Sequence, residues 1–471
     1  MADQPTAVRE FRGAWVATVD NIDWPSKPGL APDQLKAEMT KILNMAEELK
    51  LNALIFQVRP SADAMYPSQF EPWSWFLTGE QGKPPADGFD PLAWTVEESH
   101  KRGIELHVWL NPYRALHPAQ KGPVSNSHLS VTNPSSVKKY GTYLWMDPTD
   151  EVVQNRSYDV FMDLVNRYDI DGIHIDDYFY PYKVVENGVP VDFPDEESWM
   201  KVSPEVQAKG RDNWRRANVD KFIERVYKGI KERKAWVKFG ISPFGIYRPN
   251  VPEGIKAGVD QYADLYADAK KWLELGWCDY FAPQLYWPIK QTPQSFPVLL
   301  KYWREVNKKG RHIWPGQFTS RLNPKDGNWQ PSEVGNQIRL TRKGTKSPGT
   351  IHFSFKAFLQ DWNGIDWALK NSLYKDRALV PSSPWLDKSV PRRVEGIQVD
   401  KSAATISAVP LDKDARFFSI YLNDGKKWWL AKVGPAANVP IFVPGLRSAK
   451  KIDVRVVDRT GNEGPSFIKK L

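Results

Sequence analysis

Residues 170–181 read Ile-Asp-Gly-Ile-His-Ile-Asp-Asp-Tyr-Phe-Tyr-Pro, and this stretch decides the fold. Its first half, a glycine followed by β-branched residues, is typical of a short buried strand. The strand ends in two adjacent carboxylates, which are followed by aromatic residues. Carboxylates at the carboxyl end of a barrel strand, beside rings that can stack on sugars, indicate a site for glycoside chemistry.

Alternation along this strand predicts that His174, Asp176 and Tyr178 share one face, with Asp177 on the other. In a small parallel barrel, such a polar face points inward only if it lines a site. The alternative is that the two aspartates cap the following helix or bind a structural metal.

Seven further strand-like runs accompany this one, and helical patterns separate them. The eight expected strands lie at 11–18, 53–60, 105–113, 171–178, 238–245, 280–287, 312–320 and 349–358. The expected helices lie at 32–50, 90–102, 152–168, 213–233, 262–275, 296–309 and 331–342. Eight βα units in order predict an α/β fold, a (β/α)8 TIM barrel over residues 9–377. A doubly wound sheet would need a glycine-rich turn after its first strand, and residues 19–25 do not form one.

The pattern changes after a proline- and serine-rich linker at 378–390. Residues 391–471 show short alternating strands and predict a small fibronectin-III-like β-sandwich that folds independently. This part holds 15 Lys and Arg against 8 Asp and Glu. The excess suggests an anionic envelope polymer as its partner. The alternative is that these lysines only protect edge strands from pairing.

Composition narrows the class of protein. The 471 residues include 21 Trp, which suggests an aromatic-lined cleft as well as a core. The sequence holds no apolar run of about 18 residues, so we expect no transmembrane segment. The first residues lack the basic and apolar regions of an export signal. We therefore expect either a cytoplasmic protein or a mature form without its signal.

Hydrogen-bonding and stacking side chains gather at the predicted strand ends, and they suit a polyhydroxylated ligand. The expected substrate-binding residues are Arg59, Asp63, Asn111, Tyr113, Arg114, His174, Tyr178, Gln284, Tyr286 and Trp287. For Trp287, packing under the next helix is an equal alternative. The histidines His107, His174, His312 and His352 lack metal-ligand spacing, so we expect hydrogen-bonded core histidines. We expect no metal, no cofactor and no nucleic acid partner.

Glycoside hydrolysis needs two carboxyl groups, one on either side of the bond. Asp176 is the first candidate and Asp177 the second. A further carboxylate could come from Asp20, Asp23, Asp63 or the acidic loop after the fourth strand. The sixth and seventh strands bring no carboxylate to their ends, so a catalytically inactive glycan-binding protein stays open as the alternative.

Several segments resemble the glycosyl-hydrolase-10-like family of bacterial envelope proteins. They lie at 11–25, 57–60, 111–114, 171–178, 240–246 and 283–287 and follow one another in the order of that family. The resemblance implies a TIM-barrel glycosidase that is exported or lipid-anchored, and some members are implicated in cutting peptidoglycan glycan strands stripped of their stem peptides. We therefore expect a periplasmic or extracellular glycoside hydrolase that cleaves a bacterial polysaccharide, in the first place peptidoglycan glycan.

A weaker likeness is to chitinase-type barrels, whose fourth strand carries Asp-Gly-x-Asp-x-Asp-x-Glu. Asp171, Gly172 and Asp176 fit this pattern, but His174 replaces the middle Asp and Tyr178 the terminal Glu. The missing Glu argues against the chitinase mechanism operating with that same residue.

Overall fold

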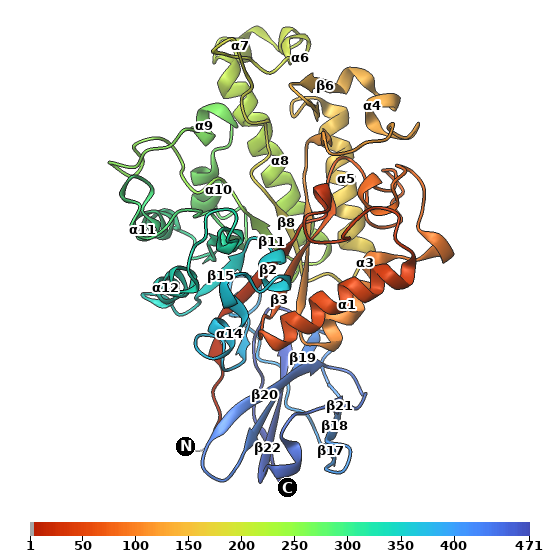
Figure 1. Ribbon diagram of the computed structural model, residues 1–471, viewed down its shortest axis with the longest axis vertical. Coiled ribbons are helices and arrows are strands. Elements are labelled where there is room, and N and C mark those ends of the chain that lie inside the picture. Colours follow the sequence, from red (N-terminus) through yellow and green to blue (C-terminus); the bar gives the residue numbers. More distant parts are fainter. Residues whose placement is uncertain (1–3) are drawn as a thin grey trace.

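The computed structural model describes residues 4–471, and its larger part is a closed parallel barrel (Figure 1). The barrel strands, in the order in which they pair, are β2 (Phe11–Val16), β3 (Ala53–Arg59), β4 (Glu105–Leu110), β8 (Gly172–Ile175), β11 (Lys238–Ile241), β12 (Tyr280–Phe281), β13 (His312–Ile313), β14 (Gly316–Gln317) and β15 (Gly349–His352). β13 pairs with β12 and β14 with β15, so these two pieces act as one broken seventh strand, and β15 returns to β2. The predicted eight-stranded barrel is confirmed. Residues 1–3, where the segment read for an export signal begins, lie outside the described residues.

Helices cover the outside of the barrel. The main ones are α1 (Pro32–Glu48), α3 (Pro91–Lys101), α5 (Glu151–Arg167), α8 (Arg211–Arg233), α10 (Ala269–Leu275), α11 (Phe296–Val306), α12 (Pro331–Arg342) and α14 (Ile365–Lys370). The single helix expected at 262–275 is wrong. It divides into α9 (Gln261–Asp264) and α10, because the Asp268 carboxylate accepts the Lys271 N–H and caps a new helix. None of the helices within 4–471 is both long and apolar enough to cross a bilayer.

The barrel strands end earlier than their sequence pattern predicts. β4 ends at Leu110 because the Asn111 side chain accepts the backbone N–H groups of Tyr113 (3.2 Å) and Arg114 (2.7 Å), which turns the chain. β8 ends at Ile175, before its two aspartates. Beyond these points the strict alternation of side chains no longer applies.

Long segments at the carboxyl end of the barrel form its upper rim in Figure 1. After β2 comes the short turn η1 (Val19–Asn21), and after β3 come α2 (Trp75–Thr78) and η2 (Ala86–Gly88). The segment after β4 folds into β5 (Arg114–Leu116), α4 (Leu129–Thr132), η3 (Pro134–Ser136), β6 (Val137–Tyr140) and β7 (Tyr143–Met146). The segment after β8 holds β9 (Val185–Glu186), β10 (Val189–Pro190), α6 (Glu196–Met200) and α7 (Pro204–Gln207).

Two antiparallel sheets follow the barrel and lie at its opposite end (Figure 1). One sheet contains β17 (Ile397–Asp400), β18 (Thr405–Ala408) and β21 (Ile441–Phe442). The other has the order β20 (Trp428–Pro435), β19 (Ala415–Asn423), β22 (Lys451–Asp458) and β23 (Phe467–Lys470). Apolar side chains such as Phe418, Ile420 and Val454 form the core of this part, as expected for a β-sandwich.

The segment expected to be a linker lies against the barrel. Its β16 (Ala378–Leu379) pairs in parallel with β1 (Val8–Arg9). Farther along, Ser383 hydrogen-bonds His312 (3.2 Å), and the Trp385 indole donates to Asp279 (2.8 Å). The C-terminal sheet also contacts the barrel closely, since a Cβ on Gly103 would lie 2.5 Å from the Val433 carbonyl oxygen.

Candidate active site

A cavity of about 270 Å³ opens at the carboxyl end of the barrel, between the tips of β2, β4, β8, β11 and β12. Its aromatic lining residues are Trp15, Trp109, Tyr143, Tyr178, Tyr182, Tyr286 and Phe353. Its polar lining residues are Asp20, Arg114, His117, Asp176, Asp177, Ser242 and Gln284. The mixture of rings and hydrogen-bonding groups is what a sugar ligand requires.

Asp176 is held in place by three N–H donors. The Trp109 indole donates to Oδ2 (3.0 Å), the Asn111 amide donates to Oδ1 (3.2 Å), and the Tyr178 backbone N–H lies 3.4 Å from Oδ1. Burial raises the pKa of Asp176, although the nearby Arg114 charge and these donors oppose the rise. The carboxyl group is therefore fixed in orientation.

Asp177 also lines the cavity, although strict alternation would turn it away. Because β8 ends at Ile175, the chain turns and both carboxyl groups reach the same space. The Tyr182 hydroxyl donates to Asp177 Oδ2, and Gln284 hydrogen-bonds the same carboxyl group. Burial, then the charge of Asp176, raises the pKa of Asp177 to about 6. A carboxyl group with such a pKa can donate a proton near neutral pH.

The wall formed by the neighbouring strands β11 and β12 supplies hydroxyl and amide groups. The Tyr286 hydroxyl lies in the field of both aspartates, and burial with their charge raises the pKa of Tyr286 well above its ordinary range. Gln284 donates to the Ser242 carbonyl oxygen (3.1 Å), which orients its amide. The Ser242 hydroxyl is buried in the cavity wall without a hydrogen-bond partner among the described residues. A ligand hydroxyl would satisfy it.

A second hollow of about 630 Å³ adjoins the first, and the two share Tyr182, Gln284 and Tyr286. Trp287 lies in this groove. Its ring is nearly perpendicular to the ring of Phe244, and the two ring centroids are 5.7 Å apart. Trp329 and Phe318 add further rings. The cavity therefore continues into an aromatic groove.

A chain of buried polar groups leads from the cavity floor through the barrel. The Trp15 indole can only donate, so His174 Nε2 accepts from it (3.1 Å) and Nδ1 carries the hydrogen toward the Tyr280 hydroxyl (3.0 Å). Tyr280 then donates to His107 Nδ1 (2.9 Å), and His107 Nε2 donates to Glu105 (3.0 Å). Burial lowers the pKa of His174, which keeps the ring neutral. This chain fixes the orientation of Trp15.

Six of the predicted substrate-binding residues line these hollows or contact them, and Tyr178 stacks under the Arg114 guanidinium at 5.1 Å. The six are Arg114, Tyr178, Gln284, Tyr286, Trp287 and, beneath Trp15, His174. The four histidines of the barrel strands are hydrogen-bonded core residues, as expected.

Four predicted substrate-binding residues lie elsewhere. Arg59 is fully buried in an ion pair with Glu71, which the loop after β3 brings back to it. Asp63 holds that loop through Ser61 N–H (3.0 Å) and Gln81 (3.2 Å). Tyr113 is buried against Phe222, and Asn111 acts on Asp176 rather than on the cavity. These four residues do not line the two hollows, because local partners occupy their polar groups or they are packed in the core.

The other carboxylates that could act together with Asp176 lie in different places. Asp20 lines the cavity from η1, in a left-handed conformation with φ 54°. Asp23 is a buried structural group that accepts the Ala17 N–H (2.7 Å) and the Ser354 hydroxyl (2.7 Å). In the loop after β8, Asp192 and Asp195 pair with Arg215. Asp20 and Asp177 are thus the carboxylates that accompany Asp176.

Several lining residues have no role predicted from the sequence, above all Trp15, Trp109, His117, Tyr143 and Tyr182. Trp109 could have been found, since it stands two positions after His107 on the inward face of β4. Tyr143 begins β7 in the long segment after β4, and Tyr182 lies in the long segment after β8, so the barrel pattern does not predict where either side chain points.

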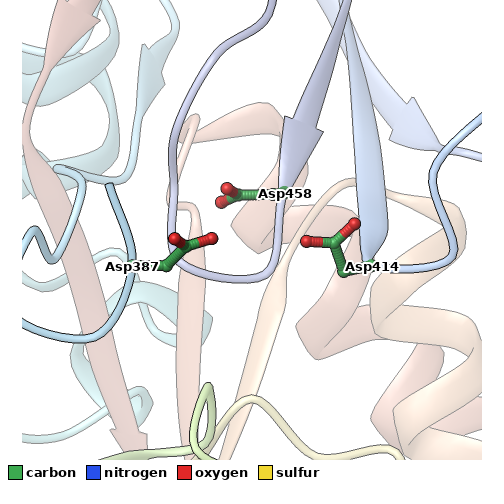
Figure 2. A group of neighbouring side chains, drawn as sticks. All are labelled: Asp387, Asp414 and Asp458. Carbon is green, nitrogen blue, oxygen red and sulfur yellow. The ribbon is translucent and has the colours of Figure 1, made fainter. Parts of the chain in front are cut away.

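One cluster of acidic side chains lies outside the cavity, where the segment after β16 meets β22 (Figure 2). Carboxylate oxygens of Asp387, Asp414 and Asp458 lie within 4.8 Å of one another. Ser389 satisfies Asp387, while Thr460 and Asn462 satisfy Asp458. Hydrogen bonds within the chain account for these two carboxylates.

The chain is similar to known proteins that are named glycosyl hydrolases. Residues 10–331 match the family model described as Glycosyl hydrolase-like 10. The chain is 39% identical to glycosyl hydrolase YngK of Bacillus subtilis over 434 residues, which cover 89% of this chain and 84% of that protein. It is 34% identical to glycosyl hydrolase DigH of Escherichia coli over 320 residues, which cover 64% of this chain and 71% of that protein.

Among solved structures, the glycoside hydrolase domain of PgaB (BpsB) from Bordetella bronchiseptica is similar at a TM-score of 0.47 and 11% identity. The similarity covers 77% of this chain and 98% of that domain. The family model spans more than half of the chain, and YngK is similar over most of its length. The chain therefore belongs to the Glycosyl hydrolase-like 10 family.

Proposed function

We propose that the protein is a glycoside hydrolase that cleaves a bacterial polysaccharide, in the first place peptidoglycan glycan strands. One observation carries the proposal: the buried carboxyl groups of Asp176 and Asp177 share an aromatic cavity at the carboxyl end of a barrel. Asp177 is the proton donor to the leaving sugar oxygen. Asp176 is the fixed carboxylate beside the reacting carbon.

Peptidoglycan is the specific substrate proposed because its glycan is a long chain of pyranose sugars. The apolar faces of such sugars can stack on the aromatic side chains of the cavity and the adjoining groove. Such a substrate lies outside the cytoplasm, and so we propose a periplasmic or extracellular location. The family membership supports a carbohydrate substrate, and the choice among carbohydrates is the part to be tested.

The test is incubation of the full chain with glycan strands stripped of peptides, with chitin oligosaccharides and with unrelated polysaccharides, and analysis of the products by mass spectrometry. Short glycan products from the stripped strands are expected, and Asp176→Asn should yield none while keeping its melting temperature. Turnover by the folded variant would contradict the assignment. Binding of glycan without any product would instead favour the second candidate, an inactive glycan-binding protein.

We also propose that the C-terminal part contributes to holding an anionic polymer. A groove of about 540 Å³ lies between β20 and the amino-terminal end of the barrel, where Lys50, Lys375, Arg377 and Lys427 line it with Trp428 and Trp429. Burial, then the neighbouring Arg377 charge, lowers the pKa of Lys50, so an anion there would be favourable. Lys427→Glu should weaken salt-sensitive cosedimentation with intact envelope polymer, and Lys413→Glu, also on an exposed residue, is the control.

A further inference from the structure

The two carboxyl groups at the tip of β8 stand on consecutive residues. Consecutive Cα atoms lie 3.8 Å apart, so these groups approach a bound sugar from one wall of the cavity. Hydrolysis with an enzyme nucleophile or an enzyme base needs the second carboxylate on the other face of the sugar ring. Among the lining residues within 4–471, Asp20 is the remaining carboxylate, and it is exposed on η1.

The residues on the strands beside β8 offer donors instead of a nucleophile. Tyr286 and Gln284 come from the tip of β12, and Ser242 comes from the tip of β11. A tyrosine, an amide and a serine can hydrogen-bond a carbonyl oxygen or a hydroxyl group, but they do not supply a carboxylate. The attacking group must then come from Asp20 with a water molecule, or from the substrate.

Asp176 has the coordination of a group that receives an N–H. Asp176 accepts N–H groups from Trp109, Asn111 and Tyr178, and the Asn111 amide reaches both of its oxygens. The same carboxylate lines the cavity, where an N–H group of a ligand can approach it. Beside it, Trp15, Trp109 and Phe353 form an apolar floor that suits a methyl group.

From this arrangement we propose that the nucleophile is the carbonyl oxygen of the substrate's own 2-acetamido group, with Asp176 accepting the acetamido N–H and Tyr286 donating to its carbonyl oxygen. The inference rests on the proposed function, since it requires a glycan of 2-acetamido sugars at this site. In this mechanism Asp176 orients the acetamido group through its N–H and forms no covalent bond to the sugar.

The reaction has two steps at C1. Asp177 gives its proton to the glycosidic oxygen while the bond from that oxygen to C1 breaks, and the acetamido oxygen forms a new bond to C1. The acetamido N–H proton passes to Asp176, which leaves a neutral oxazoline and a released glycan alcohol. A water molecule then loses a proton to Asp177 and attacks C1, the oxazoline C1–O bond breaks, and the nitrogen regains its proton from Asp176.

The electrostatics of the pair agree with these roles. Asp177 must be protonated at the start, and burial with the Asp176 charge raises its pKa to about 6. Asp176 must take up a proton only transiently, and burial raises its pKa without removing the opposing Arg114 charge. The product keeps the configuration of the substrate at C1, because two displacements occur there.

The first experiment measures binding without turnover. The probes are the thiazolines of N-acetylglucosamine and N-acetylmuramic acid, which resemble the oxazoline in shape. Calorimetry should show one of them binding at least about 10-fold more tightly than its parent sugar, and Asp176→Asn should remove that gain. Equal affinity for thiazoline and parent sugar would overturn the proposal, even if the protein cleaves glycan.

The second experiment uses whichever glycan the protein cleaves. Proton NMR should show retention at C1, and partly de-N-acetylated strands should resist cleavage at the glucosamine units. Inversion, or cleavage at glucosamine units, would overturn the mechanism and leave the hydrolase function intact. Loss of turnover in Asp20→Asn, together with inversion in the wild type, would make Asp20 the base and would overturn the substrate oxygen as nucleophile.

Discussion

Strand β8 carries buried aspartates at both of its ends, and the two ends have opposite electrostatics. Asp171 and Asp177 are 5% and 3% exposed. At the amino end, Arg416 from the C-terminal sheet donates to Asp171 at 2.8 Å, and His100 lies 2.9 Å from it. Burial alone would raise the pKa of Asp171, but the Arg416 and His100 charges outweigh burial and hold it well below its ordinary range.

At the carboxyl end, Asp177 has the neutral donors Tyr182 and Gln284, and its pKa is raised to about 6. The difference lies in the counter-charge, since burial is alike at the two ends. A carboxylate neutralised by an arginine stabilises an interface and stays ionised. A carboxyl group that lacks such a partner can exchange a proton at the pH where an enzyme works. The C-terminal sheet therefore places a cation beside Asp171 at the amino end of the barrel, and it places none beside Asp177 at the carboxyl end.

The largest expected effect is at the chemical end. Asp177→Asn should lower kcat by about 10³-fold or more, because the leaving sugar loses its proton donor. The melting temperature should not fall, since an amide can keep the Tyr182 hydrogen bond. Steady-state kinetics on the glycan identified above is the measurement. A folded variant with near-normal turnover would place the proton donor elsewhere and would remove the contrast between the two ends.

The next effect is at the structural end. Arg416→Met should destabilise the protein by about 3–5 kcal/mol, because the buried Asp171 would lose its main cationic partner. Urea unfolding measures the loss, and kcat of the folded protein should stay within about twofold. Arg392→Met is the matched control, since Arg392 is exposed and its pair with Asp412 should contribute about 0–1 kcal/mol. A small loss for Arg416→Met would mean that the sheet docks through its apolar contacts alone.

The barrel could be predicted because buried parallel strands leave near-continuous apolar runs, and eight of these recur between amphipathic helices. The position of Asp177 could not be predicted. Alternation holds only while the backbone stays in the ladder, and β8 leaves it at Ile175. The burial of Arg59 could not be predicted either, because its partner, Glu71, comes from a loop whose path no periodic pattern predicts.

The docking of the C-terminal sheet was equally hidden from the sequence. The basic excess there suggested an external anion, yet Arg416 and Arg459 pair with Asp169 and Lys432 pairs with Glu47 of the barrel. Charge counts do not reveal which charges face each other across a contact. An ion pair between residues that are hundreds of positions apart in the chain cannot be predicted from the sequence.

The pH dependence of stability should differ in sign between the two ends. The folded pKa of Asp171 is depressed, so its contribution to the free energy of unfolding is present above the unfolded value of about 4 and is lost as the pH falls below it. The folded pKa of Asp177 is raised to about 6, so folding favours its protonated form. Stability from Asp177 therefore declines as the pH rises from about 4 to 6, by about 3 kcal/mol in total.

Asp177→Asn should remove that decline. Urea unfolding from pH 4 to pH 8 should show the variant gaining stability relative to the wild type as the pH rises, while both lose stability below about pH 4. If the two curves stay parallel from pH 4 to pH 8, Asp177 does not titrate in this range, and the electrostatic contrast along β8 is wrong.

The smallest effect concerns the groove beside the cavity. Trp287 packs edge-on against Phe244 yet keeps a partly exposed face in the groove. If that face stacks on a sugar, Trp287→Ala should raise KM by about 5–10-fold with kcat nearly unchanged, since stacking of this kind contributes about 1 kcal/mol. Trp367→Ala is the control, because Trp367 is 72% exposed on α14 and lines neither hollow. An unchanged KM with a clear fall in melting temperature would assign Trp287 to packing, and the chemical end of the barrel would then bind its substrate through the central cavity.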